Sequence, residues 1–124
     1  MMPEVDYRDW SDQAMIKQPA THTHEQFEQL ANLFRLLSDR TRLNLLILLS
    51  DGEKNVTSLC DTLKLPQPTV SHHLGLLRMS NVIINRRDGK QVFYALDDNV
   101  NVAGRGLDID SHSFSVSIRP KAGT

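Results

Sequence analysis

The apolar positions of residues 25–37 recur every three or four places, which is the spacing of one face of an α-helix. We therefore predict a helix here, preceded by a Thr23/Gln26 pair that fits a capping box. Its expected buried stripe consists of Phe27, Leu30, Ala31, Phe34 and Leu37. Residues 1–22 carry only a weak pattern, so we treat them as an N-terminal extension.

Three more helices follow with the same period. Residues 40–50 are apolar on almost every side, which predicts a central, buried helix capped by Ser38 or Asp39. A short helix begins after Asn55, a good N-cap residue, and a fourth carries Pro68 in its first turn, where a missing N–H costs nothing. The expected inner positions of the three helices are Leu43, Leu46 and Ile47, then Val56, Leu59, Cys60 and Leu63, then Val70, Leu74 and Leu77.

After the fourth helix the apolar period changes from 3.6 to 2, which is the alternation of a β-strand. The runs 82–84 and 92–96 are rich in β-branched and aromatic residues, and a basic segment with the pair Asp88-Gly89 lies between them. An Asp-Gly pair between two such runs is a strong β-hairpin signal. Alternation returns over residues 107–118, where we expect one further strand with Phe114, Val116 and Ile118 on a common face.

This order of elements defines the predicted fold class. Two short helices joined by a tight turn and followed by a basic-tipped hairpin describe a winged helix-turn-helix. We predict a mainly α domain with a β-hairpin wing (α+β) over residues 23–96, and a C-terminal extension over residues 97–124 that contains the strand.

Charge and cysteine content restrict the partners and the cellular location that we expect for this chain. Residues 35–95 hold nine Lys and Arg against five Asp and Glu, whereas the rest of the chain holds five against ten. A modestly basic middle is compatible with a surface that contacts phosphates. Cys60 is the only cysteine, so no internal disulfide can form and we expect a cytoplasmic protein. The polar, acidic N-terminus is not a secretory signal, and the apolar runs are too short for a membrane span, so we expect no membrane association.

Three stretches resemble the ArsR/SmtB family of bacterial winged-helix repressors. They are LLSDRTRLNLLILLSDGE at 36–53, VTSLCDTLKLPQPTVSHHLGLLRMSNVI at 56–83 and RRDGKQVFYAL at 86–96, about half of the chain. The resemblance implies a homodimeric repressor whose affinity for DNA is changed by a ligand, often a metal ion. It also implies that the C-terminal strand stands in place of the family's usual last helix. Two copies would bind a palindromic operator in double-stranded DNA, with reading heads about 34 Å apart.

Candidate DNA contacts lie on the fourth helix and the hairpin. Opposite its inner stripe, the helix carries short polar groups that can reach base edges and phosphates, and Gly75 leaves room for close approach of a duplex. The resemblance implies base contacts from the start of this helix. The candidates are Gln67, Thr69, Ser71, His72 and Arg78 on the helix and Arg86, Arg87 and Lys90 on the hairpin, with Arg40, Arg42 and Lys54 as further phosphate contacts. A merely solvated helix face is the alternative, and Arg40, Arg42 and Lys54 are as well explained as merely exposed residues.

The adjacent histidines His72 and His73 do not form a metal-binding pair. Successive residues of an α-helix lie about 100° apart around its axis, so the two rings diverge. His72 points outward and is the better DNA contact. His73 lies beside the inner stripe, where we expect a packed, hydrogen-bonded ring.

The metal ligands that the resemblance implies are missing. Residues 54–58 contain no cysteine at the start of the third helix, and Val100 stands where the family has the histidine of an Asp-x-His pair. We therefore expect no cofactor, and a structural role for Cys60. The remaining candidates for a metal ion are His22, His24, Asp108, Asp110 and His112.

The chain carries no Gly-rich phosphate loop or recognisable nucleophile motif, so we do not expect an enzyme. We predict a sequence-specific DNA-binding transcriptional regulator, a homodimeric repressor released by an unidentified signal. One alternative is a metal-responsive derepressor that uses the His and Asp candidates. The other is a winged-helix module that binds a protein instead of DNA, which the acidic flanks favour slightly.

Overall fold

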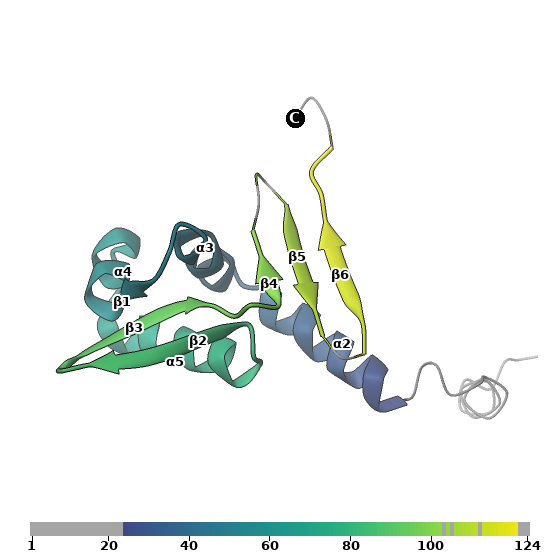
Figure 1. The fold of residues 1–124 in the computed structure, drawn as a ribbon, viewed down its shortest axis with the longest axis horizontal. Helices are drawn as coiled ribbons and strands as arrows, with labels where there is room; N and C mark the ends of the chain where they lie inside the picture. Colours follow the sequence, from purple (N-terminus) through teal and green to yellow (C-terminus); the bar gives the residue numbers. More distant parts are fainter. Residues whose placement is uncertain (1–23, 103, 105, 112, 122–124) are drawn as a thin grey trace, which may run out of the picture.

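The computed structural model describes residues 24–102, 104, 106–111 and 113–121, in which helices are followed by a hairpin and a second sheet (Figure 1). The helices are α2 (His24–Leu37), α3 (Arg40–Leu49), α4 (Val56–Leu63) and α5 (Gln67–Met79). The strands are β1 (Lys54–Asn55), β2 (Ile83–Asp88), β3 (Gln91–Leu96), β4 (Val100–Asn101), β5 (Leu107–Asp110) and β6 (Ser115–Ile118). This order confirms the predicted helices and hairpin, while Thr23 of the predicted capping box lies outside the described residues. Among these helices none is long and apolar enough to cross a membrane.

The helical core forms where the inner faces of α3, α4 and α5 meet. Its best buried side chains, each at most 1% exposed, are Leu45, Leu46, Leu59, Val70, Leu74 and Leu77. Burying a Val or Leu side chain contributes about 1.5–3 kcal/mol, so these contacts hold the three helices together. Two predicted N-caps are present: Asp39 accepts the backbone N–H of Arg42 at 3.0 Å, and Asn55 accepts that of Ser58 at 2.8 Å.

The predicted hairpin is β2 and β3, and β1 pairs with the other edge of β3. Asp88 pairs with Gln91, so the loop consists of Gly89 and Lys90 alone. Gly89 has φ +62°, a conformation that glycine adopts without strain. The hairpin therefore turns one residue later than the Asp-Gly pair indicated. Strand β1 was not expected, because two residues are too few to show an alternation.

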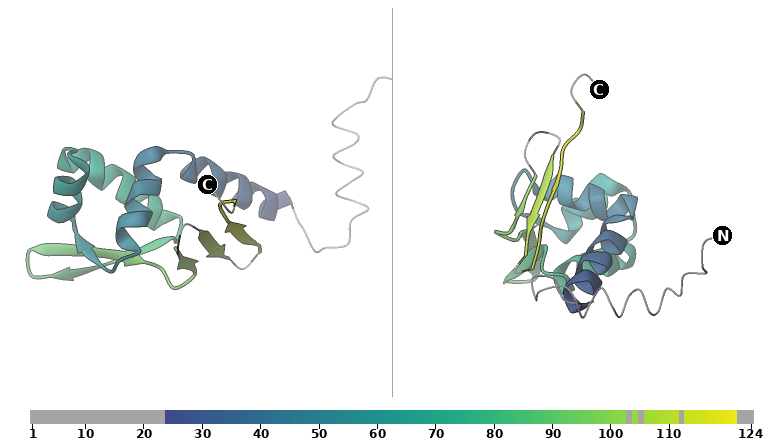
Figure 2. Two further views of the ribbon diagram at one scale, coloured as in Figure 1. Left: turned by 90° about the horizontal axis from the view of Figure 1, so that it is seen from above. Right: turned by 90° about the vertical axis from the view of Figure 1, so that its right-hand side faces the viewer.

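The C-terminal segment forms a second antiparallel sheet in the order β4-β5-β6. Our prediction of one strand was wrong, because the chain turns back after Ser111, whose N–H donates to the carbonyl of Phe114 at 2.9 Å. The sheet stands beside α2 in Figures 1 and 2. Val100 and Ile109 are 6% and 2% exposed and belong to the same core as the helices. This segment is thus packed on the domain that precedes it.

The predicted inner faces of α2 and α3 were partly wrong. The buried residues of α2 are Leu33, Leu36 and Leu37. The large apolar residues that lie outside are Phe27 (54% exposed), Phe34 (50%), Leu43 (38%) and Ile47 (56%). Within one chain, only one side of each of these helices packs against other elements. Apolar periodicity does not distinguish a side that faces the core from a side that faces another molecule.

The inner stripe of α5 should dominate stability. Replacing Leu74, which is fully buried, by alanine should lower the free energy of unfolding by about 2–5 kcal/mol, because a cavity replaces buried methyl groups. Met79 on the same helix is 79% exposed, and Met79→Ala should change the value by less than about 0.5 kcal/mol. Urea denaturation of the two variants measures both effects, and similar losses would contradict the assigned inner face.

Candidate nucleic-acid interface

The outer side of α5 carries the polar residues that the sequence singled out. Pro66 occupies the N-cap in an extended conformation, and Pro68 lies in the first turn, so the start of the helix is fixed. Because the inner stripe is buried, the other side of the first two turns is open to solvent. Gln67, Thr69, Ser71 and His72 are all exposed there. These hydroxyl, amide and imidazole groups match the hydrogen-bonding groups on the floor of a DNA major groove.

Gly75 lies in the middle of the same helix. A Cβ at this position would meet no atom within 4 Å, so packing among the described residues does not require glycine. A helical glycine costs about 0.5–1 kcal/mol relative to alanine. The chain therefore gives up stability to leave the backbone bare at this point, which favours close approach of another molecule.

His73 adds a polar contact between α5 and α3 to the packing of their apolar faces. Its side chain is 15% exposed, and Nδ1 lies 3.2 Å from Nη1 of Arg42 and 3.8 Å from Oδ2 of Asp39. A guanidinium only donates, so Nδ1 is the acceptor and the neutral ring carries its proton on Nε2. This arrangement agrees with the expected packed, hydrogen-bonded ring.

Arg42 also caps the end of α2. Its Nε donates to the carbonyl of Leu36 at 2.6 Å, and its Nη2 donates to that of Arg35 at 3.5 Å. The last carbonyls of a helix lack partners within the helix, and a cation there also offsets the negative end of the dipole. The sequence alone leaves two roles open for Arg42, a phosphate contact or a merely exposed cation. The structure instead uses it to join α2, α3 and α5.

Asp39 caps the N-terminus of α3. The backbone N–H of Arg42 lowers the pKa of this carboxyl below its ordinary value of 3.8, and the charge of Arg42 acts in the same direction. A lowered pKa means that the ionised cap stabilises the fold above pH 3.8 and that this contribution is lost as the pH falls through the folded-state value. The N-cap of α3 is therefore ionised and fully formed at neutral pH.

The two wing arginines are successive residues of β2, so their side chains lie on opposite faces of the hairpin. Arg86 donates Nε to Glu53 at 2.9 Å and a second bond through Nη2, and its guanidinium lies 4.7 Å from the ring centroid of Phe93. The side-chain hydrogen bond lowers the pKa of Glu53 and raises that of Arg86. Arg86 is thus committed to a contact within the protein.

Arg87 occupies the other face of the hairpin, which it shares with Asn85. Asn85 accepts a hydrogen bond from Nε of Arg78 at 2.9 Å, so this is the face that meets α5. Arg87 is exposed and makes no ion pair or side-chain hydrogen bond within the part of the chain that the structure describes. Lys90 is exposed in the loop of the hairpin. The structure therefore leaves Arg87 and Lys90 available to phosphates. Arg78 could contact DNA through its Nε only after its hydrogen bond to Asn85 is broken.

The candidate metal ligands are not gathered in the described chain. His22 and His112 lie outside the described residues, and His24 is near Glu28 in an exposed pair at 3.8 Å. Asp108 accepts hydrogen bonds from Arg119 at 2.8 Å and from Ser117 at 2.7 Å, and these two bonds lower the pKa of its carboxyl. Asp110 accepts one from Ser115 at 2.6 Å. No group of three or more potential ligands occurs among the described residues, which therefore do not fit a metal ion.

Comparison with known proteins agrees with this geometry. Residues 39–84 match the model of the arsR family of bacterial regulatory proteins. The arsenical resistance operon repressor of Escherichia coli is 45% identical over 69 residues, which are 55% of this chain and 59% of that protein. An uncharacterized HTH-type transcriptional regulator of Methanocaldococcus jannaschii is 40% identical over 78 residues, 61% of this chain and 88% of that protein. The chain belongs to the ArsR family.

A solved structure similar to this ArsR-family chain is a homodimeric winged helix-turn-helix DNA-binding domain from Mycobacterium bovis. It is 27% identical with a TM-score of 0.54, and the match covers 56% of this chain and 65% of that one. The predicted fold class and resemblance are thus confirmed. The relatives are named as regulators, in agreement with the prediction that this ArsR-family protein is not an enzyme.

The contacts of Arg42 predict a measurable difference from its neighbour Arg40. Arg42→Ala removes three hydrogen bonds of a charged group and should lower the free energy of unfolding by about 1.5–3 kcal/mol. Arg40 is exposed on the same helix, and Arg40→Ala should change it by less than about 0.5 kcal/mol. Equal effects in urea denaturation would contradict the role of Arg42 in joining the three helices.

Proposed function

We propose that this chain is a sequence-specific DNA-binding transcriptional repressor, in which α5 enters the major groove and the wing contacts the backbone. The observation that carries the proposal is the combination of the exposed polar start of α5 with Arg87 on the hairpin face that meets this helix. Side chains on α5 would read base edges, and the wing cations would contact phosphates. The relatives' names as transcriptional repressors support the same function.

We further propose that two copies bind a palindromic operator. Phe34 is 50% exposed on α2, and Ile47 is 56% exposed on α3, although both are large apolar side chains. Exposed apolar surface of this kind is commonly covered by a partner molecule. The homodimeric relative from Mycobacterium bovis supports a second copy of this chain as that partner. Because the target is chromosomal DNA, we place the protein in the cytoplasm.

The wing arginines provide the first test. Fluorescence anisotropy of the full chain on the DNA upstream of its own gene should show specific, salt-dependent binding. Arg87→Ala should lower the slope of log K against log salt concentration by about one, because one phosphate contact is lost. Arg86→Ala should leave the slope unchanged, because Arg86 contacts Glu53 and Phe93 on the other face. Absence of specific binding by the unsubstituted chain would refute the proposed function.

Gly75 provides a test that separates binding from stability. Gly75→Ala should raise the free energy of unfolding by about 0.5–1 kcal/mol, because alanine is the better helix former and its Cβ meets no neighbour. The same change should weaken operator binding, because the methyl group stands between the helix backbone and the duplex. Thermal unfolding and anisotropy measure the two effects. A more stable variant with unchanged affinity would show that α5 does not approach DNA at this position.

Two other functions make different predictions in the same assay. A metal-responsive derepressor would release the operator on addition of Zn(II), Ni(II) or Cu(I), which the scattered positions of the described His and Asp side chains do not favour. A protein-binding module would show no salt-sensitive DNA binding and no effect of replacing Ser71 and His72. The proposed repressor is distinguished from both by binding that depends on α5 and not on added metal.

A further inference from the structure

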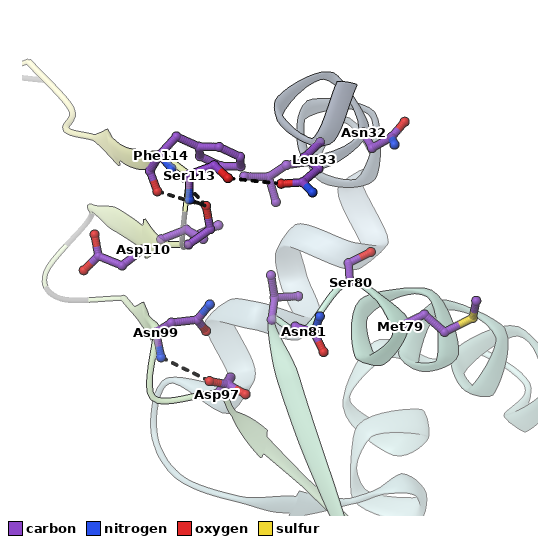
Figure 3. Close-up of a pocket in the computed structure, with 14 residues that line it drawn as sticks. Asn32, Leu33, Met79, Ser80, Asn81, Asp97, Asn99, Asp110, Ser113 and Phe114 are labelled. Atoms are coloured by element: carbon purple, nitrogen blue, oxygen red, sulfur yellow. Dashed lines mark hydrogen bonds between the residues drawn. The ribbon is translucent and has the colours of Figure 1, made fainter. Parts of the chain in front are cut away.

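The strongest unassigned feature of the chain is a cavity of about 870 Å³ beside the end of α5 (Figure 3). Four parts of the fold line it: α2, the turn from α5 to β2, the segment after β3, and the β5–β6 hairpin. Its volume lies in the range of about 300–1,000 Å³ that small-molecule sites occupy. It exists because the C-terminal sheet stands beside α2 without filling the space between them.

The lining combines an apolar wall with amide groups. Leu33, Val82 and Ile109 belong to the buried core and form the apolar part, to which Phe114 adds an aromatic ring. Asn81 and Asn99 contribute side-chain amides. Such a mixture suits an organic molecule that has an apolar body and a polar end.

The charged residues in the lining favour one sign of charge on the polar end of the ligand. Asp97 and Asp110 are the charged residues among the described residues that line the cavity, and no Lys, Arg or His accompanies them. The Asp110 carboxylate already accepts a hydrogen bond from Ser115 and points away from the other labelled side chains in Figure 3. Asp97 is therefore the better placed negative charge, and an anionic ligand would meet no counter-charge from the described lining residues.

Asn99 lies close to Asp97 in the segment after β3. Oδ1 of Asn99 is buried and has no hydrogen-bond partner in the part of the chain that the structure describes. The backbone N–H of Asn99 donates to Oδ1 of Asp97 at 3.2 Å, and both residues line the cavity. Because Oδ1 of Asn99 is closed off from solvent, a ligand in the cavity meets the Asp97 carboxylate and not this oxygen.

We propose that this cavity binds a small organic cation, an amine attached to an apolar body, and that this ligand is the signal of the repressor. The second part rests on the proposed function. Ser80 and Asn81 follow directly on α5, and Leu33 belongs to α2, so a ligand between them contacts both the reading helix and the helix that carries exposed Phe34. Binding at this junction favours one relative position of the two helices and thereby changes operator affinity.

Isothermal titration calorimetry of the full chain with tryptamine tests the site without DNA. We expect tryptamine to bind and indole-3-acetate, which has the same ring and the opposite charge, not to bind. Asp97→Asn should weaken tryptamine binding about tenfold or more, since a hydrogen bond to a charged group is lost. Asp98→Asn is the matched control, because this exposed neighbour does not line the cavity, and it should leave binding unchanged.

A second variant guards against misfolding of Asp97→Asn. Ser80 is exposed at the rim, so Ser80→Lys should leave the fold intact and weaken tryptamine binding by placing a like charge beside it. The site is refuted by no binding of tryptamine, by equal binding of both indoles, or by equal losses in the Asp97 and Asp98 variants.

Anisotropy on the operator then tests the regulatory part. Tryptamine should change operator affinity about 5- to 150-fold, and this change should be absent in Ser80→Lys. An unsubstituted chain that binds tryptamine and DNA independently would refute the signalling role alone. A chain that fails to bind DNA without ligand would refute the proposed function, while the calorimetry would still decide whether the cavity is a cation site.

Discussion

Burial of one face of α5 is the constraint on which the rest of the structure depends. Val70, Leu74 and Leu77 are fully buried, and together they contribute about 4.5–9 kcal/mol to the folded state. A hydrogen bond adds about 0.5–1.5 kcal/mol, or about 1.5–3 kcal/mol where a charged group takes part, so no single one approaches the value for the whole stripe. The apolar stripe therefore decides which face of the helix turns outward. The polar start of α5 is presented to solvent as a consequence of that burial.

Polar contacts then fix the elements around this helix. Arg42 joins the end of α2 to His73 of α5, and Arg86 holds the wing against Glu53. Directional bonds of this kind contribute less energy than the core, but they restrict rotation and sliding that a stripe of methyl groups tolerates. Arg42 and Arg86 thus make contacts within the protein, while their neighbours Arg40 and Arg87 remain exposed. The division of basic residues into structural and available ones is thus a property of the fold and not of charge.

The period of the apolar residues was enough to predict those parts of the fold whose contacts all lie within one chain. The inner faces of α4 and α5, the caps at Asp39 and Asn55 and the hairpin all follow from local spacing. The outward position of Phe34 was not predictable, because an apolar residue at helical spacing has the same signature whether it meets a core or another molecule. The roles of Arg42 and Arg86 were missed because their partners are distant in sequence. The cavity has no sequence signal, since it arises from the way two separately formed elements stand beside each other.

The C-terminal sheet changes how a signal can reach α5. The N–H of Asp97 donates to the carbonyl of Val82 at 3.0 Å, so the sheet joins the domain at the base of the wing, next to the end of α5. Val100 and Ile109 extend the core to this point. A change at this junction acts on the C-terminal end of α5, whereas the candidate base contacts lie at its N-terminal end. Reading and sensing can therefore use separate residues of one rigid helix, and the chain needs no ligand-binding side chain on the face that would contact DNA.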